Sequence, residues 1–441
     1  MKFDLEYLQR SLTSLAQQPS LLVGLSGGMD SVVLLYGMCK VAEESLSLGA
    51  IRALHVNHGL QAEADQWQNF CESLCNDLGV PLHCEKVEIE RHKSPDLSIE
   101  NIARKARYGV FESQLQDGEV LILGHHLDDQ LETLLFRLNR GAGLKGLTAI
   151  PKKRDLAKGE IYRPLLEVGR KELQRFAEEH NLQWIKDLSN QDTSFDRNFL
   201  RNEILPVIES RWPNYRSSWG KSLQLIREAN GMLQELADSD LSSLLKEDKS
   251  VISIIELVEL SEARQRNVFR YWIGKSGLPD PGWNLLQQMV CEFATLDKQG
   301  EAVIAANGFS FRRYRDSLYL LKEKANPPGN LNWIPREKPE LEIEGCGTLV
   351  AREVIGEGLA KSQADSFDIR FRKGGESCRL LGRPSKSLKK LLQEANIEPW
   401  WRERIPLIYR DNELVCIPGI GVAETSAAAP NEPGIELQWW R

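Results

Sequence analysis

The sequence predicts an α/β fold for its first part, in which helices cover a parallel sheet, followed by a mainly helical middle part and a small α+β C-terminal part. Short apolar runs alternate with helical patterns over residues 1–140, as expected for consecutive β–α units. All seven histidines precede residue 181, and nine of the eleven tryptophans follow Arg211, so the composition changes near residue 212. A proline-rich segment at 324–339 then separates the last part.

The predicted elements follow from these patterns in chain order. Apolar runs predict strands in the first part, at 21–25, 51–56, 82–89 and 120–123. Helical periodicity predicts helices there, at 31–44, 64–78, 97–115 and 128–140. The middle part shows helical patterns and then a β-rich stretch, at 222–235, 261–274, 284–292 and 302–321. We therefore expect three domains, at 1–212, 213–323 and 345–441. A linker at 324–344 separates the last two.

A tight turn with two adjacent glycines follows the first predicted strand and precedes the first predicted helix. It consists of Ser26, Gly27, Gly28, Met29, Asp30 and Ser31. Glycine lets backbone N–H groups approach an anion closely, and the helix start and two hydroxyls add positive potential and donors, so the turn predicts a phosphate site. Asp30 would repel a phosphate unless a divalent cation or an ammonium group lies beside it. Because no GxxxxGK[ST] pattern occurs, the turn favours adenylate chemistry over γ-phosphoryl transfer.

The bulk composition describes a globular chain. With 441 residues, of which 41% are hydrophobic and 27% charged, the chain is long enough for about three domains with cores of their own. No apolar run is long enough to cross a membrane, and the N-terminus has no signal-peptide pattern, so we expect a cytoplasmic protein with no membrane partner. The eight cysteines form no CxxC pair, which favours buried thiols over disulfides. A metal or sulfur-relay site at Cys71, Cys75 and Cys84 is the alternative.

A second polar string follows the strand predicted at 120–123. It reads GHHLDDQLET over residues 124–133, and in a parallel sheet it opens on the same edge as the glycine turn. Asp129 and Glu132 lie three residues apart at a helix start, so both carboxylates can face one way and bind Mg²⁺ or the ammonium group of an amino acid. The alternative is helix capping, which we take as the explanation of Asp128.

The loop after this helix contains a GxGxxG match and three basic residues. A dinucleotide-binding turn has to follow a strand, whereas this one follows a helix, so we reject that interpretation. The loop is instead a candidate for contact with phosphate or RNA backbone. Its basic residues are Arg137, Arg140 and Lys145.

Two pairs of arginines at helical spacing are further candidates for phosphate contact. Arg104 and Arg107 lie about one turn apart on a polar-edged helix face that also holds Phe111. Arg197 and Arg201 lie four residues apart after a polar stretch. For the first pair, the alternative is a solvent-exposed helix face with salt bridges. For the second pair, a capped helix start would explain the polar stretch but not the two arginines. We favour phosphate contact for Arg107 and for the second pair.

The C-terminal part carries a basic segment on a chain that is acidic as a whole. The net charge is −7, yet residues 370–410 contain eleven Lys or Arg and four Glu. Such a segment attracts phosphate backbones locally, whatever the total charge. A solvated helix face is the alternative. The candidate RNA contacts are Arg372, Lys373, Lys386, Lys389 and Lys390.

Several of these strings together resemble a known family. The hexapeptide at 26–31 resembles the SGGxDS signature of the PP-loop ATP-pyrophosphatases, which have an adenine nucleotide alpha hydrolase-like fold. Further strings are similar to those of the tRNA(Ile)-lysidine synthetases, at 55–60, 100–108, 124–147, 187–206, 371–376 and 387–400. Clear similarity covers 20–206 and 368–422, whereas the middle part is similar in position and character only.

This resemblance implies a ligase that joins L-lysine to carbon 2 of the wobble cytidine in a tRNA(Ile) with a CAU anticodon. The carbonyl oxygen at that carbon is a poor leaving group, so ATP first adenylates it with release of pyrophosphate, and the lysine ε-amine then displaces AMP. By similarity, the turn at 26–31 holds the pyrophosphate, Asp30 and Asp129 hold Mg²⁺, and Asp129 with Glu132 holds the lysine or the metal. The implied catalytic residues are Asp30, Arg107, Arg197 and Arg201, whose arginines would neutralise developing charge.

The resemblance also implies that the middle and C-terminal domains bind tRNA. Two other enzyme classes stay open, a PP-loop tRNA sulfur-transfer enzyme and an amidating PP-loop synthetase. A nonenzymatic RNA-binding module is the alternative from another class. The sequence does not indicate an oligomeric state.

Overall fold

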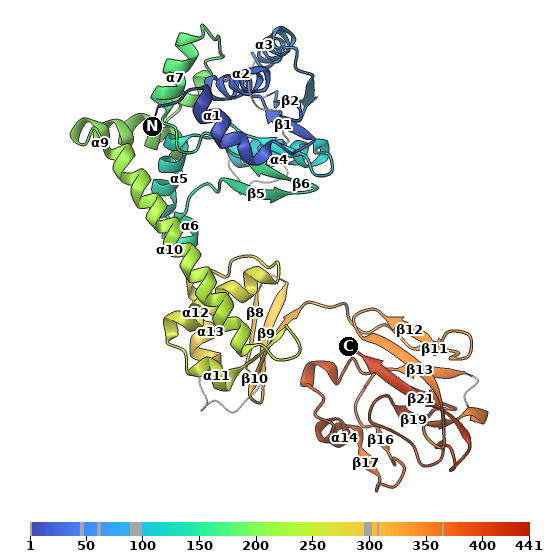
Figure 1. Cartoon of the computed structure of the whole chain (residues 1–441). Helices are drawn as coiled ribbons and strands as arrows, with labels where there is room; N and C mark the ends of the chain where they lie inside the picture. The colour runs from blue at the N-terminus through green and yellow to red at the C-terminus, as the bar shows by residue number, and fades with distance from the viewer. Residues whose placement is uncertain are drawn as a thin grey trace. The chain divides into compact units, whose positions relative to one another are not determined.

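The computed structural model describes residues 2–44, 48–59, 63–88, 99–294, 302–306, 308–363 and 366–441. Contacts divide the chain into two compact units, Met1–Leu236 and Ala237–Arg441, which we call the first and the second unit (Figure 1). Within the described ranges, no helix has the length and apolar character needed to cross a membrane.

The first unit is built on a six-stranded sheet in the order β3-β2-β1-β4-β6-β5. Neighbouring strands run parallel except for β5, which is an antiparallel edge. The strands are β1 Ser20–Gly24, β2 Ala50–Asn57, β3 Leu82–Lys86, β4 Val120–Ile122, β5 Lys153–Leu156 and β6 Gly159–Tyr162. The helices are α1 Leu5–Leu12, α2 Met29–Glu44, α3 Ala64–Asp77, α4 Ile99–Gln114, α5 Leu127–Asn139, α6 Leu144–Leu147, α7 Arg170–Glu179, α8 Asp196–Phe199, α9 Leu205–Arg211 and the start of α10 Tyr215–Leu244.

Alternation along the central strand places apolar side chains on both faces of this sheet. Leu21 and Val23 of β1 belong to a core that includes residues of α1, α2 and α7. Leu22, between them, belongs to a second core that includes Val110 and Phe111 of α4. Helices therefore cover both faces, as the all-apolar runs predict for parallel strands. The carboxyl ends of β1, β2 and β4 are left for ligands.

The structure confirms the fold class and the predicted elements of the first unit, with small shifts at their ends. The helix after the glycine turn begins at Met29, within the turn itself. The β5–β6 hairpin was not predicted, because its strands are short and carry charged residues. Phe111, expected on a polar-edged face, is buried, since the apolar stripe of α4 is wider than expected. The predicted strand end at Ile89 and helix start at Leu97 lie outside the described residues.

The middle part of the chain is helical with one small sheet, as its patterns predict. A core of residues from α10 and the following elements holds it together. Its helices are α11 Ile254–Val258, α12 Glu262–Lys275 and α13 Gly282–Phe293, after α10. Its strands are β7 Val251–Ser253, β8 Val303–Ala306, β9 Phe309–Tyr314 and β10 Ser317–Lys322, in the order β7-β10-β9-β8.

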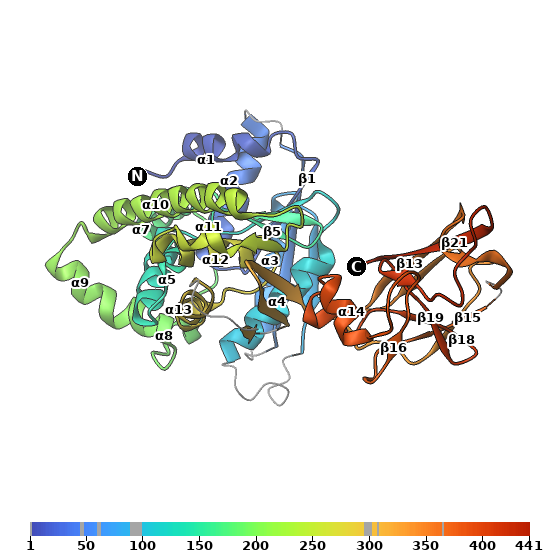
Figure 2. The ribbon, with the colours of Figure 1, turned by 90° about the horizontal axis from the view of Figure 1, so that it is seen from below.

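The C-terminal part is mainly β, with α14 Leu388–Glu394 at one end of its strands (Figure 2). One sheet has the order β11-β15-β18-β19-β20, a second β12-β13-β21-β14, and β16 pairs with β17. The strands are β11 Leu331–Trp333, β12 Glu340–Ile343, β13 Gly347–Ile355, β14 Leu359–Ala360, β15 Phe367–Arg370, β16 Ser377–Cys378, β17 Lys386–Ser387, β18 Leu407–Arg410, β19 Glu413–Ile417, β20 Gly421–Val422 and β21 Pro433–Trp440. Strands β11 and β12 both lie within the predicted linker, where β11 pairs with β15 and β12 with β13. The exact domain boundaries stay predictions.

Candidate active site

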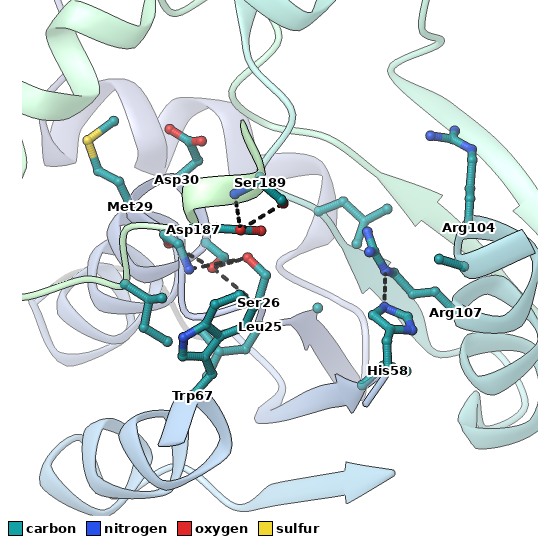
Figure 3. A pocket seen from close by; sticks show the side chains of 18 of the residues that line it. Leu25, Ser26, Met29, Asp30, His58, Trp67, Arg104, Arg107, Asp187 and Ser189 are labelled. Carbon is teal, nitrogen blue, oxygen red and sulfur yellow. Dashed lines mark hydrogen bonds between the residues drawn. The ribbon is translucent and has the colours of Figure 1, made fainter. Parts of the chain in front are cut away.

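A cavity of about 990 Å³ lies at the carboxyl ends of β1, β2 and β4. Figure 3 shows Ser26 and Asp30 on one side of it and Arg104 and Arg107 on the other. The sheet edge thus brings together strings that are far apart in the sequence. The predicted site residues that line the cavity are Ser26, Gly28, Met29, Asp30, Ser31, Arg107, Asp129, Arg197 and Arg201.

The glycine turn is held in one conformation by its own hydroxyls and by a neighbouring segment. The Ser31 hydroxyl donates to the Gly28 carbonyl at 2.9 Å and accepts from the Ser26 N–H at 3.2 Å. Gly27 has a φ of +80°, and a Cβ there would lie 2.4 Å from the Ile185 side chain, so only glycine fits. The Ile185 N–H donates to the Gly27 carbonyl at 2.9 Å. The turn therefore presents N–H groups at the start of α2, as an anion site requires.

His55 supports the strand that leads into this turn. It is buried at the end of β2, and its Nδ1 lies 2.9 Å from the Leu25 carbonyl. Burial lowers the pKa of His55, so the ring is neutral and donates its Nδ1–H to that carbonyl. The sequence showed this histidine only as part of a string, because its contact is made across two strands.

A buried imidazole joins the two predicted metal-binding carboxylates. His126 is 2% exposed, and its Nε2 lies 3.5 Å from an Asp30 oxygen and 3.6 Å from an Asp129 oxygen. Burial opposes protonation of His126, but Asp129, Asp30 and Asp128 outweigh it and raise its pKa to about 9. An imidazolium therefore supplies positive charge beside Asp30, where we expected only a cation or an ammonium group. Spacing could not reveal it, because Asp30 is distant in the sequence.

Arg201 is bound to the two carboxylates predicted to bind lysine or metal. It donates to both oxygens of Glu132 at 2.7 and 2.9 Å and to Asp129 at 3.2 Å. Glu132 is 2% exposed, and burial raises its pKa. For Asp129, burial opposes ionisation, but His126, His125 and Arg201 outweigh it and lower the pKa to about 2. Asp129 is thus the ionised carboxylate that faces the cavity, while Glu132 positions Arg201.

Asp128 does not cap its own helix, so that interpretation was wrong. The cap of α5 is made by Asp129, which accepts from the His126 N–H at 2.9 Å. Asp128 instead accepts from the Arg170 N–H at 2.9 Å, at the start of α7, and from Arg216 at 2.6 Å. Its carboxylate therefore ties α5 to α7 and α10. Sequence spacing favours the nearest helix, whereas the fold brought another helix end closer.

Each of the two remaining predicted catalytic arginines is anchored by a hydrogen bond to a neighbouring side chain. Arg107 donates its Nε–H to His58 Nε2 at 3.1 Å, as Figure 3 shows. Burial and Arg107 lower the pKa of His58 to about 4, so this histidine is a neutral acceptor. Arg197 donates to the Thr133 hydroxyl at 3.1 Å. Both guanidinium groups line the cavity, where they can neutralise phosphate charge.

The cysteine cluster carries no metal site in the described part of the chain. Cys71 and Cys75 are buried and Cys84 is half-buried, all without disulfides. Burial raises the pKa of Cys71 to about 12, so the group is a thiol. No group of three or more His, Cys, Asp or Glu side chains among the described residues could hold a metal ion. Buried structural thiols, the favoured interpretation, agree with this environment.

The predicted RNA contacts near the cavity differ in their hydrogen bonding and exposure. Arg137 donates to the Gly146 carbonyl at 2.6 Å and the Ala149 carbonyl at 2.9 Å, so it holds the loop after α5 in place. Arg140 and Lys145 are exposed. Contact of these three residues with RNA stays a prediction.

The predicted RNA contacts of the C-terminal part lie around α14 and a glycine turn. Lys389 and Lys390 are exposed on α14, and Lys386 is paired with Glu394 at 2.7 Å. The remaining two, Arg372 and Lys373, precede a turn in which the Glu376 carboxylate accepts from backbone N–H groups. Contact of these five with RNA also stays a prediction.

Three segments of the chain match known domain families. Residues 4–208 match the PP-loop domain. Residues 252–319 match the TilS substrate binding domain, and residues 367–439 match the TilS substrate C-terminal domain. Each match falls in one of the three parts that the sequence patterns separate.

Curated proteins are similar to the chain over nearly its whole length. The tRNA(Ile)-lysidine synthase of Coxiella burnetii is 37% identical over 99% of this chain and 97% of its own. That of Photorhabdus laumondii is 35% identical over 98% of both chains. That of Serratia proteamaculans is 39% identical over 95% of both.

Proposed function

The chain belongs to the tRNA(Ile)-lysidine synthase family, and we propose that it joins L-lysine to carbon 2 of the wobble cytidine in a tRNA(Ile) with a CAU anticodon. One observation carries this function. The glycine turn at 26–31, the ionised Asp129 and several arginines line a single cavity, so adenylation of the cytidine and attack by the lysine amine can take place at one site. The reaction consumes ATP, which the PP-loop domain binds.

In the first half-reaction the oxygen on carbon 2 attacks the α-phosphorus of ATP, and the bond to pyrophosphate breaks. The N–H groups of the turn at 26–31 hold the departing pyrophosphate against the start of α2. Arg107 and Arg197 neutralise the charge that develops on the phosphate oxygens. Their anchors, His58 and Thr133, fix each guanidinium so that little reorganisation is needed.

In the second half-reaction the lysine ε-amine attacks carbon 2, AMP leaves with the former carbonyl oxygen, and the lysine nitrogen releases one proton to water. Asp129 is the carboxylate that lies in the cavity and stays ionised, so it holds an ammonium group of the incoming lysine. Arg201, bound to Glu132 behind it, keeps that carboxylate in place.

The residues present fit a magnesium ion bound together with the nucleotide. Asp30 Oδ1 is buried and accepts no hydrogen bond from the described residues, so it has a free ligand atom. Magnesium in nucleotide sites uses one or two carboxylates and takes its other ligands from phosphates and water. Asp30 and Asp129 would hold the ion, which would neutralise charge on the pyrophosphate. His126 orients both carboxylates.

The test is lysine incorporation by the full chain. Labelled lysine, ATP and tRNA(Ile) with a CAU anticodon should give labelled tRNA and one AMP for each lysine joined. The matched control is the same tRNA with the wobble cytidine replaced by uridine, which should accept none. Label transfer from a sulfur donor or from ammonia, with none from lysine, would instead indicate one of the two alternative enzyme classes. RNA binding without AMP release would indicate a nonenzymatic module.

A further inference from the structure

Two arginines from different elements meet on one tyrosine beside the cavity. The guanidinium carbon of Arg104, on α4, lies 5.2 Å from the centre of the Tyr108 ring. That of Arg154, on β5, lies 5.2 Å from the same ring. Stacking on an aromatic ring orients a guanidinium group while its N–H edges stay available. The Tyr108 ring therefore holds both guanidinium groups in defined orientations.

The register of the edge hairpin explains why Arg154 reaches this tyrosine. Arg154 pairs with Ile161 and lies two residues from Leu156, and both apolar residues pack in the core with α4. Lys153, one residue earlier, pairs with Tyr162 and points to the opposite face of the sheet. One face of the hairpin thus adds a cation to the α4 side of the cavity.

The positive charge of Arg104 and Arg154 is not neutralised by carboxylates of the described residues. Arg104 and Arg154 are exposed, and neither forms an ion pair with a carboxylate among the described residues. Beneath them, Arg163 is 3% exposed and donates to the Pro151 carbonyl at 2.8 Å and to His125 at 3.3 Å. Burial lowers the pKa of Arg163, and Arg154 and Arg104 lower it further, so these cations repel one another. A cluster of this kind is stabilised when a polyanion binds.

The position of the cluster indicates which polyanion. Arg104 lines the cavity, whereas Arg154 lies beyond its lining, so the pair leads outward from the reaction site. A base that enters the cavity must leave its stack, which places its flanking phosphates at the entrance. We propose that Arg104 and Arg154, stacked on Tyr108, bind the phosphodiester backbone of the RNA loop next to the nucleotide that reacts. This inference rests on the proposed function and adds residues that read the RNA by its backbone.

The test compares two neighbouring cations on opposite faces of one strand. Arg154→Gln in the full chain should raise the KM for tRNA about tenfold, because a charge-assisted hydrogen bond to the RNA is removed, and leave the KM for ATP unchanged. The slope of log(kcat/KM) for tRNA against log salt should become shallower by roughly 0.7 for each phosphate that is no longer bound. Lys153→Gln, the matched control, should change neither quantity. Arg154→Lys should retain most of the salt slope, because it keeps the charge.

Three outcomes separate this inference from its rivals. An unchanged KM for tRNA in Arg154→Gln and in Arg104→Gln would overturn it. A raised KM for ATP with an unchanged KM for tRNA would overturn it too, because the arginines would then bind nucleotide phosphates. Should Arg154→Gln not fold, Arg104→Gln carries the same test. If the unaltered chain incorporates no lysine, the proposed function fails, whatever the variants do.

Discussion

The cavity of the first unit and the basic segment of the second unit are both rich in charge, but they are built in opposite ways. At the cavity, the half-buried Asp129 and Arg201 lie in the lining, and Arg201 is bound at short distances to Asp129 and to the buried Glu132 behind it. On α14, Lys389 and Lys390 are exposed. Buried charges depend on each partner, because an unpaired one pays its full desolvation cost, whereas exposed charges act nearly independently and are screened by salt.

The largest effect is expected at Asp30, the half-buried carboxylate that we propose holds the magnesium ion beside the reacting phosphates. Asp30→Ala should reduce AMP release by about 100- to 1000-fold, the range found when one preorganised charge-stabilising group is removed. The measurement is the rate of AMP release with saturating ATP, lysine and tRNA. Thermal unfolding checks that the fold survives. A turnover within a few-fold of the unaltered chain would contradict the role given to Asp30.

The next effect concerns stability within the same cavity. Glu132→Ala removes the carboxylate that accepts two hydrogen bonds from Arg201, so it should lower the free energy of unfolding by about 3 kcal/mol. The exposed pair of Glu43 and Lys40, 2.6 Å apart, is the control. Glu43→Ala should cost less than about 1 kcal/mol, because exposed ion pairs contribute little. Equal losses in denaturant unfolding would remove the distinction between buried and exposed pairs.

The pH dependence of stability gives a smaller effect. The pKa of His58 is about 4 in the folded chain, below its ordinary value of 6.5, so the unfolded chain binds more protons between these values. This histidine therefore contributes stability above pH 6.5 that is lost as the pH falls toward 4. After allowance for its partial exposure, the loss is roughly 1–2 kcal/mol. His58→Gln should reduce the difference in unfolding free energy between pH 7 and pH 5, and an unchanged difference would refute this.

The smallest effect is expected at the exposed lysines of α14. Lys389→Gln with Lys390→Gln should weaken tRNA binding several-fold at low salt and make its salt dependence shallower by roughly 0.9 for each lysine, if both face paired phosphates. Lys338→Gln, an exposed cation outside the basic segment, is the control. The double variant should keep its thermal stability. An unchanged salt slope would place the RNA contact of the C-terminal part elsewhere.

Local patterns were enough to predict much of this protein. The apolar runs around 21–25 and 120–123 predicted strands, and the two glycines predicted a tight turn between strand and helix, because both depend on neighbours in the chain. The short, charged strands β5 and β6 escaped prediction, because their place in the sheet is fixed by pairing with β4 and not by their own composition.

The partners of the charged groups were decided only by the tertiary structure. The sequence predicted Asp30, Asp129 and Arg201 as site residues, but it could not place His126 between the first two or pair Arg201 with Glu132. Spacing determines which side chains share a helix face, since the helical repeat is fixed. It says nothing about which strands bring two distant segments to one edge of a sheet, and a buried charge takes its partner from whatever that edge provides.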